Sequence, residues 1–287
     1  MSDRHKQEFG ISQGCPLSPF LFVMVMSVLL HDAKKKLVST GEVELSTELV
    51  VNELVYADDT LLIDTSSTTL QVFMDCIADV GAEYGMTFNW KKLEMLPVRT
   101  TGQIKKPDGD AIKSKDSMLY LGSLLSADGG VASEMGRRLG MAQSDFQTLD
   151  RIWKHSTLSR TKKIRIFNAC ICTKLCYGLF TAALNLKDRR RIDGFQARCL
   201  RKILKIPSSY YSRISNATVL EIAGETLLST KILGEQQRYL TKISARPHDD
   251  ATRLCIYQPG SENLRESTYE RGRGRPRRTW IAGVAGH

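Results

Sequence analysis

The spacing of the apolar residues changes at the turn sequence Asp128-Gly129-Gly130, and this change constrains the fold more than any other feature. Before the turn, short apolar runs bounded by polar residues are typical of strands, and they alternate with helical patterns. After the turn, apolar residues recur every three to four positions, which predicts helices over 133–152, 159–184 and 187–205. The 287 residues therefore predict an α+β part followed by an α-helical part.

The first part is expected to contain two helices. Ser18 is a suitable cap and Pro19 a suitable first residue for a mostly buried helix that continues through the apolar run 20–37. A second helix is ended by Gly85, and its apolar face consists of Leu70, Phe73, Met74, Ile77, Val80 and Tyr84. Apolar stretches predict strands over 49–56, 60–64 and 86–89, and a strand or hairpin over 118–125.

Two adjacent carboxylates lie between the first two predicted strands, in the sequence Tyr56-Ala57-Asp58-Asp59. Adjacent carboxylates on a tight turn repel one another, and a divalent cation would relieve that repulsion. Because carboxylate oxygens are hard ligands, the cation expected at Asp58 and Asp59 is Mg²⁺ or Mn²⁺. The simpler alternative is a solvated hairpin turn without a metal, which is the more common origin of an Asp-Asp pair.

Charge is distributed unevenly along the chain. Residues 1–132 contain 12 Lys and Arg against 18 Asp and Glu, which leaves 29 against 13 for residues 133–287. A basic surface can hold a phosphate backbone, although it can equally be an ordinary solvated face. Within the helix predicted over 187–205, one basic face lies beside the apolar stripe and is the candidate for backbone contacts: Arg191, Arg198, Lys202 and Lys205.

A second basic segment, RGRGRPRR at 271–278, lies near the C-terminus. Arg273 and Arg275 could follow the narrow minor groove of A·T-rich DNA, because the neighbouring glycines permit a close approach. A disordered basic tail that binds any polyanion is the plainer interpretation.

Membrane and secretory functions are not supported by the composition. The longest apolar run, 20–30, is shorter than the roughly 20 residues that a bilayer requires, and Met1 opens a charged segment rather than a signal peptide. The seven cysteines have no regular spacing, which favours buried thiols in a reducing compartment over a disulfide framework. We therefore expect an intracellular protein, nuclear or cytoplasmic, without a membrane partner.

Four segments occur in the order of the motifs of reverse transcriptases. GISQGCPLSP at 10–19 resembles motif B, YADDT at 56–60 motif C, YGMTFNWKK at 84–92 motif D, and LYLG at 119–122 the primer-grip hairpin. The amino-acid sequence of the first segment is most similar to that of non-LTR retrotransposons of the long interspersed element type. LCYG at 175–178 and LRKI at 200–203 resemble the thumb of these elements, so the resemblance covers roughly residues 5–207.

This resemblance implies a partial polymerase palm over 1–128, an antiparallel sheet with packed helices, followed by a helical thumb over 129–207. A basic, partly disordered C-terminal region over 208–287 would complete the chain. The implied activity is RNA-directed DNA synthesis with an RNA template, a DNA primer and deoxynucleotides. Asp58 would be the main metal ligand and Asp59 an auxiliary one, and Lys92 would protonate or screen pyrophosphate. Template and nucleotide would contact Gln13, Gly14, Pro16, Ser18 and Tyr56, and the primer grip would be Tyr120, Leu121 and Gly122.

The family places a third metal-binding aspartate in motif A, upstream of motif B. Only nine residues precede Gly10, and Asp3 is the sole aspartate among them. We therefore expect that this chain alone does not polymerise DNA, and that Mg²⁺ or Mn²⁺ acts only in the complete polymerase. Two alternatives stay open: a non-catalytic nucleic-acid-binding protein that uses the basic thumb and tail, and a fragment without a cellular role.

Overall fold

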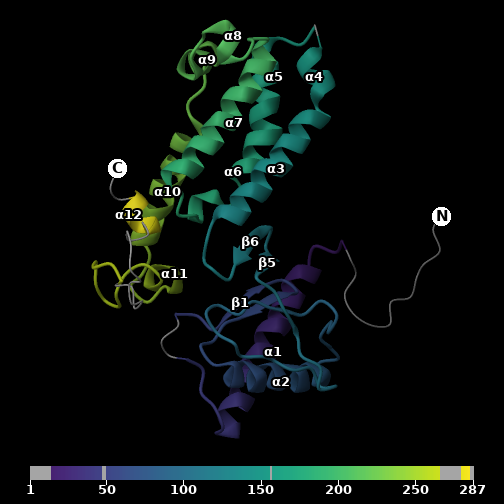
Figure 1. The fold of residues 1–287 in the computed structure, drawn as a ribbon. Helices are drawn as coiled ribbons and strands as arrows, with labels where there is room; N and C mark the ends of the chain where they lie inside the picture. Colours follow the sequence, from purple (N-terminus) through teal and green to yellow (C-terminus); the bar gives the residue numbers. More distant parts are fainter. Residues whose placement is uncertain (1–13, 47–49, 156, 266–278, 285–287) are drawn as a thin grey trace, which may run out of the picture. The chain divides into compact units, whose positions relative to one another are not determined.

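The computed structural model describes residues 14–46, 50–155, 157–265 and 279–284, and Figure 1 shows their secondary structure. The chain divides into two compact units, 1–116 and 117–287, each with its own internal contacts. Each unit is therefore described by itself. None of the helices in the described ranges has the length and apolar character needed to cross a lipid bilayer.

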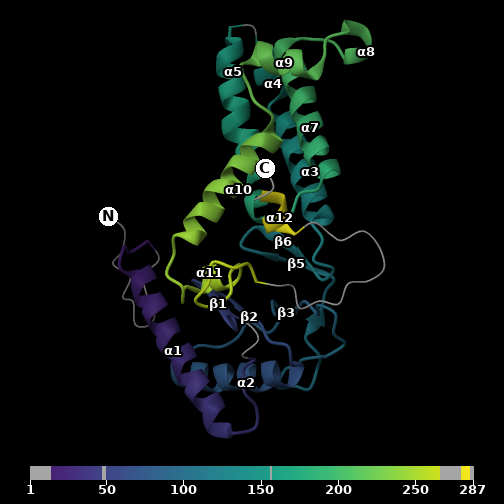
Figure 2. The ribbon, with the colours of Figure 1, turned by 90° about the vertical axis from the view of Figure 1, so that its left-hand side faces the viewer.

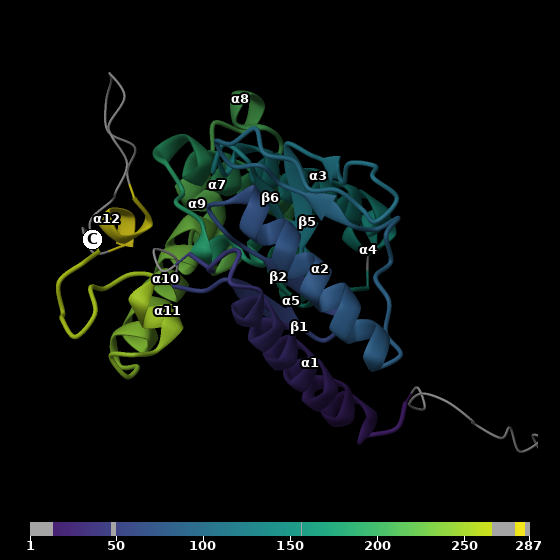
Figure 3. The same cartoon turned by 90° about the horizontal axis from the view of Figure 1, so that it is seen from below.

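Unit 1 is built on two helices that lie side by side, α1 (Ser18–Thr40) and α2 (Ser67–Glu83) (Figure 3). Strands β1 (Glu53–Tyr56) and β2 (Asp59–Leu62) form an antiparallel hairpin, as the sequence predicted. Strands β3 (Glu94–Met95) and β4 (Lys113–Ser114) make a short parallel pair. The unit is therefore a mixed α and β structure with a small apolar core between its two helices.

Helix α1 is less buried than its sequence predicted. Only its second half packs against α2, through Leu29, Leu30, Ala33 and Leu37. The prediction of a mostly buried helix is wrong for the first half, because no apolar surface among the described residues of this unit covers it. The large exposed apolar side chains there are Phe20, Leu21, Val23, Met24 and Val28.

The start of α1 also differs from expectation. Ser18 lies inside the helix rather than capping it, and Leu17 at the cap position makes no side-chain hydrogen bond to the helix. Pro19 does occupy the first turn, where its missing N–H costs nothing. The predicted Ser18 cap is therefore wrong by one residue, which is the usual uncertainty of a helix end.

Helix α2 follows its sequence pattern closely. The Ser66 hydroxyl accepts a hydrogen bond from the Thr69 N–H, and Phe73 and Val80 are buried on the predicted face. Gly85, with φ 70°, ends the helix in the left-handed conformation that favours glycine. The strand predicted over 86–89 does not form, because the Met86 N–H donates to the Gly81 carbonyl and holds the chain against the end of α2.

Unit 2 consists of a hairpin and a bundle of helices, and Figure 2 shows helices α3, α7 and α10 of this bundle. Its core contains four buried aromatic side chains, Phe146, Trp153, Phe167 and Phe195. The elements are β5 (Ser117–Tyr120), β6 (Ser123–Ser126), α3 (Ala132–Thr148), α4 (Asp150–Lys154), α5 (Arg160–Phe167), the π-helical turn η1 (Asn168–Cys172), α6 (Thr173–Cys176), the 3₁₀ turn η2 (Leu179–Thr181), α7 (Leu186–Leu204), α8 (Ser209–Ser212), α9 (Asn216–Ala223), α10 (Leu228–Ser244), α11 (Ala251–Leu254) and α12 (Trp280–Val284).

The hairpin over 118–125 and the helix over 187–205 are confirmed by β5–β6 and α7. Helix α7 begins with a capping box between Asn185 and Asp188. The helix predicted over 159–184 is interrupted at Gly178, whose φ is 72°. A side chain at this position would bring its Cβ within 2.7 Å of the Ser123 hydroxyl, so the break serves the packing of the hairpin.

Residues after α7 fold back onto it. The buried Gln196 amide donates to the Thr226 carbonyl and accepts from the Leu228 N–H, which fixes the start of α10. Further along, the Trp280 indole donates to the Phe180 carbonyl.

The predicted division into a palm, a thumb and a C-terminal region at residues 128 and 207 stays a prediction. The arginine-rich segment with Arg273 and Arg275 lies outside the described residues.

Two matched substitutions test whether the units unfold separately. Phe73 in unit 1 and Phe167 in unit 2 are both fully buried, so Phe73→Ala and Phe167→Ala should each cost about 3–5 kcal/mol. We expect each variant to destabilise only its own unit, measured by hydrogen exchange with peptide-level mass spectrometry during urea unfolding. Equal loss of protection in both units from either variant would show that the chain unfolds as one body.

Candidate functional site

The paired aspartates occupy the tip of the β1–β2 hairpin. Tyr56 pairs with Asp59 across the strands, which leaves Ala57 and Asp58 as the two turn residues. Ala57 has φ 54°, a left-handed conformation that costs a non-glycine residue about 1–2 kcal/mol. Strain of this kind is frequent at functional sites, so the turn is a candidate site by its backbone as well as by its charge.

Both carboxylates are open to solvent. Tyr56, Asp58 and Asp59 are exposed, and across the described ranges neither aspartate has a hydrogen bond or an ion pair with another side chain. Their oxygens are therefore available to a hard divalent cation. In the part of the chain that the structure describes, no group of three or more His, Cys, Asp or Glu residues could hold a metal. The donors present fit such a cation in kind but supply two carboxylates only.

The hairpin and the first half of α1 leave unit 1 with exposed apolar surface. Leu54 and Val55 on β1 are each 41% exposed, and among the described residues the β1–β2 pair is a sheet of two strands. Apolar patches of this kind are usually covered by another element. The surface beside the aspartates is therefore suited to receive a further segment of polypeptide.

The loop before α1 carries the motif B residues. Gly14 has φ 89° and open space around it, and Pro16 is exposed; Gln13 lies outside the described residues. The pKa of the exposed Cys15 thiol is below its ordinary value, because the N–H groups of Leu17 and Ser18 and the Ser18 hydroxyl donate to the sulfur. The start of α1 thus stabilises negative charge at this loop.

Lys92 lies in a turn in which its N–H donates to the Asn89 carbonyl, and its side chain is exposed. Within the described residues, Lys92 makes no hydrogen bond or ion pair with Asp58 or Asp59. The structure therefore does not bring the motif D lysine into contact with the motif C aspartates.

The β5–β6 hairpin in unit 2 is held by a polar cluster that the sequence did not reveal. Leu121 and Gly122 form its turn, with φ values of 47° and 76°. The Gly122 carbonyl accepts hydrogen bonds from Arg137 (2.8 Å) and Arg138 (2.6 Å), and the Leu121 carbonyl accepts one from the Tyr177 hydroxyl (3.0 Å). The expected primer-grip turn is therefore rigid, and it presents the partly exposed Leu121 side chain.

Glu134 completes this cluster. Its carboxylate accepts from Arg137, Arg138 and the Leu124 N–H, and its side chain is only 10% exposed. Burial opposes its ionisation, but the hydrogen bonds from the two arginines outweigh burial and hold the pKa of Glu134 below its ordinary value. The spacing of Glu134 and Arg138 by four residues was the available signal, and this spacing is typical of ion pairs on the surface of a helix.

The basic face predicted on α7 is exposed, but its members differ. Lys202 forms an ion pair with Asp150, and Arg191 lies 4.0 Å from the carboxylate of Asp188. Arg198 has no hydrogen bond or ion pair within the described residues, and Lys205 caps the helix with φ 60°. Arg191 and Arg198 are therefore the more available cations of this face.

Comparisons with known proteins indicate the class of protein that the chain resembles. A family model described as reverse transcriptase (RNA-dependent DNA polymerase) matches residues 2–125. The chain is also 25% identical, over 299 aligned positions and 97% of its length, to the retrovirus-related Pol polyprotein from type-1 retrotransposable element R2 of Popillia japonica. It spans 39% of the length of that relative. The resemblance to reverse transcriptases of non-LTR retrotransposons is thereby confirmed.

Substitution of Glu134 tests the cluster that holds the hairpin. Glu134→Gln should destabilise unit 2 by on the order of 3 kcal/mol at pH 7, because it leaves two arginines without a counter-charge. The native pKa of Glu134 is lowered, so its stabilisation is complete above the unfolded value of about 4.3 and is lost as pH falls through the native value. The deficit should therefore shrink in urea unfolding at acid pH.

The matched control is Glu235→Gln, which removes the same charge from an exposed ion pair with Arg238. It should cost less than about 1 kcal/mol at any pH. Equal effects of the two substitutions, or a Glu134→Gln deficit that does not change with pH, would contradict the role given to Glu134.

The lowered pKa of Cys15 predicts faster alkylation at neutral pH than that of an unperturbed thiol, because the thiolate is the nucleophile. Iodoacetamide labelling followed by mass spectrometry should give a pH midpoint for Cys15 below that of a model cysteine peptide. Ser18→Ala should move this midpoint upward, since one donor to the sulfur is lost. An ordinary midpoint in the parent chain would show that the start of α1 does not stabilise the thiolate.

Proposed function

We propose that this chain supplies part of a polymerase that synthesises DNA on an RNA template. The observation that carries the proposal is the strained, solvent-exposed turn that presents Asp58 beside Asp59 on the β1–β2 hairpin. A turn that served only to reverse the chain would be easier with glycine at position 57. The match of residues 2–125 to the reverse transcriptase family supports the same conclusion.

Asp58 is the main ligand in this proposal and Asp59 an auxiliary one, because neighbouring side chains of the hairpin diverge. A bound Mg²⁺ or Mn²⁺ would supply positive charge that stabilises the phosphoryl oxygens during nucleotide transfer. Gln13, Gly14, Pro16, Ser18 and Tyr56 line the path of template and nucleotide. Lys92 would protonate or screen pyrophosphate, and Tyr120, Leu121 and Gly122 would hold the primer end.

Two carboxylates do not complete a two-metal site, which needs a further bridging ligand. The exposed apolar surface of α1 and the hairpin provides a place where a segment with that ligand could dock. The 287 residues tested alone are therefore expected not to synthesise DNA. A nuclear or cytoplasmic location suits this function, and the free cysteines are compatible with either location.

Primer extension on an RNA template with Mg²⁺ tests the proposal. The 287-residue chain should incorporate no nucleotide. A chimera with the upstream polymerase segment of the R2 relative should extend the primer. Asp58→Asn in the chimera should lower the rate by at least about 100-fold, because a metal ligand is lost. Asp108→Asn, an exposed aspartate of the same unit, is the matched control and should leave the rate unchanged.

A chimera whose activity survives Asp58→Asn would refute the metal role of the hairpin. If the 287-residue chain alone extended the primer and Asp58→Asn abolished that extension, the need for a third carboxylate would be refuted.

A second candidate function is non-catalytic binding of nucleic acid through the basic thumb and tail, including Arg273 and Arg275. The charge distribution favours it, since residues 133–287 carry 29 Lys and Arg against 13 Asp and Glu. Binding of this kind should fall steeply with salt and should survive Asp58→Asn. If deletion of 265–287 abolished binding to an A·T-rich duplex, the binding of A·T-rich DNA would be assigned to the tail.

A further inference from the structure

The first half of helix α1 carries an apolar face that is uncovered among the described residues. Four of its side chains, each between 40% and 63% exposed, form the α1 stripe: Leu17, Leu21, Met24 and Val28. At about 100° per residue these four fall within about 60° of one another, on the side of the helix away from the residues packed against α2. Figure 2 shows this half of α1 extending beyond α2. The α1 stripe is therefore open to a partner along its whole length.

The spacing of the α1 stripe is the same in both directions. Its members are separated by four, three and four residues, the alternation by which helices pack in a coiled coil. Because this spacing reads identically from either end, an antiparallel second copy of α1 would place Leu17 opposite Val28. The same pairing would place Leu21 opposite Met24. This is a two-fold interface, in which both copies use the same surface, so the α1 stripe is complementary to itself.

The distribution of charge favours the antiparallel orientation. Residues 18–30 contain no ionisable side chain, so no charge is buried when two stripes meet. Lys34, Lys35 and Lys36 follow the stripe, and in an antiparallel pair they would lie beyond the first residue of the partner's helix. A parallel pair would instead bring these lysines against their own copies and align the two helix dipoles.

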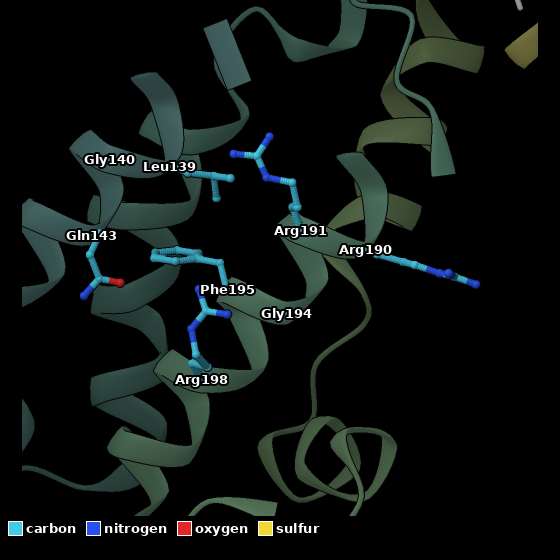
Figure 4. Close-up of a pocket in the computed structure, with 8 residues that line it drawn as sticks. All are labelled: Leu139, Gly140, Gln143, Arg190, Arg191, Gly194, Phe195 and Arg198. Atoms are coloured by element: carbon cyan, nitrogen blue, oxygen red, sulfur yellow. The ribbon is translucent and has the colours of Figure 1, made fainter. Parts of the chain in front are cut away.

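A groove between α3 and α7 in unit 2 is a contrasting surface. Its apolar residues Leu139 and Phe195 lie among Arg190, Arg191 and Arg198, as Figure 4 shows. Two copies meeting at this groove would bring three guanidinium groups from each copy together, and like charges facing one another across an interface are costly. The α1 stripe has no such repulsion. Of these two surfaces it is therefore the one suited to a second copy.

The size of the apolar face indicates how strongly two copies would associate. The exposed Phe20 and Val23 flank the α1 stripe and enlarge the face. Exposed apolar patches on monomeric proteins reach about 300–600 Å². Two such patches together would bury at most about 1,200 Å², which is the lower limit of a stable specific interface. The expected association is therefore weak, with a dissociation constant on the order of micromolar.

We propose that two copies of this chain pair through the α1 stripe as an antiparallel helix dimer. This pairing goes beyond the proposed polymerase function. The second copy covers the same surface on which a further polymerase segment would dock, so the two occupants exclude one another. A chain paired in this way is completed by that segment only after the dimer dissociates.

Sedimentation velocity of the full chain between about 1 and about 100 µM tests the pairing. The parent chain should change from monomer to dimer over this range. Met24→Glu should weaken the dimer at least about tenfold, because its carboxylate enters an apolar interface without a partner. Raising KCl from about 50 to about 500 mM should not weaken the parent dimer, since salt screens charges but not apolar contacts.

A pair of opposite charges tests the register. Leu21→Lys alone should weaken the dimer as Met24→Glu does. A mixture of the Leu21→Lys and Met24→Glu chains should dimerise more tightly than either chain alone, because each lysine meets a glutamate of the partner. A mixture of Met24→Lys and Met24→Glu should show a smaller rescue, since position 24 faces position 21 rather than itself.

Two controls separate the interface from general effects. Val38→Glu introduces the same charge on the same helix, at a side chain that is 78% exposed but lies outside the α1 stripe. It should change the dissociation constant less than about threefold. Urea unfolding at a concentration where the chains are monomeric should give the same midpoint for Met24→Glu as for the parent chain, because the exposed Met24 is not part of the core of unit 1.

A parent chain that stays monomeric at every concentration would overturn the proposal and leave the face to a different polypeptide segment. A dimer that weakens with salt and survives Met24→Glu would also overturn it, and would assign association to the acidic and basic halves of the chain. Stronger rescue by the two position-24 chains would overturn the antiparallel register. No nucleic acid or nucleotide enters these measurements, so each of these results leaves the proposed polymerase function standing.

Discussion

The carboxylate of Glu134 is the interaction on which the helical unit most depends. It forms ion pairs with Arg137 and Arg138, and those arginines hold the Gly122 carbonyl at the turn of the β5–β6 hairpin. Arg138 also donates to the Lys174 carbonyl and lies over the Tyr177 ring, so the same cluster joins α3, α6 and the hairpin. A buried charge without a partner is very costly, and each member therefore requires the others. The hairpin is rigid because its backbone oxygens are part of this cluster.

Both candidate functional hairpins place a non-glycine residue in the left-handed region, Ala57 at one turn and Leu121 at the other. The two turns are stabilised differently. Polar partners hold the Leu121 turn, whereas within the described residues the Asp58 and Asp59 side chains beside Ala57 have none. The Leu121 turn is thus complete within its own unit. The Ala57 turn combines a strained backbone with unneutralised charge, which a cation and a neighbouring segment would relieve.

Local patterns in the sequence predicted the elements whose formation depends on local interactions. The apolar stripe and the terminating Gly85 predicted α2, and the stripe with Ile192 and Phe195 predicted α7. Apolarity alone did not show which neighbour would cover α1, so its burial was overestimated. The helix break at Gly178 depends on the distant Ser123, and the burial of Arg138 depends on Glu134 and Gly122. The candidate aspartates were recognisable from sequence, whereas the groove required the pairing of α3 with α7.

The two units differ in how complete they are. Unit 2 supplies the partners of two of its buried arginines: Arg138 binds Glu134, and Arg201 donates to the Pro207 and Ile214 carbonyls and to the Asn216 side chain. Among its described residues, unit 1 places no third carboxylate with Asp58 and Asp59 in a group that could hold a metal. It also leaves the first half of α1 uncovered. The helical unit is therefore self-contained in these buried polar contacts, whereas the hairpin unit leaves its charged turn and the apolar face of α1 open to a further segment.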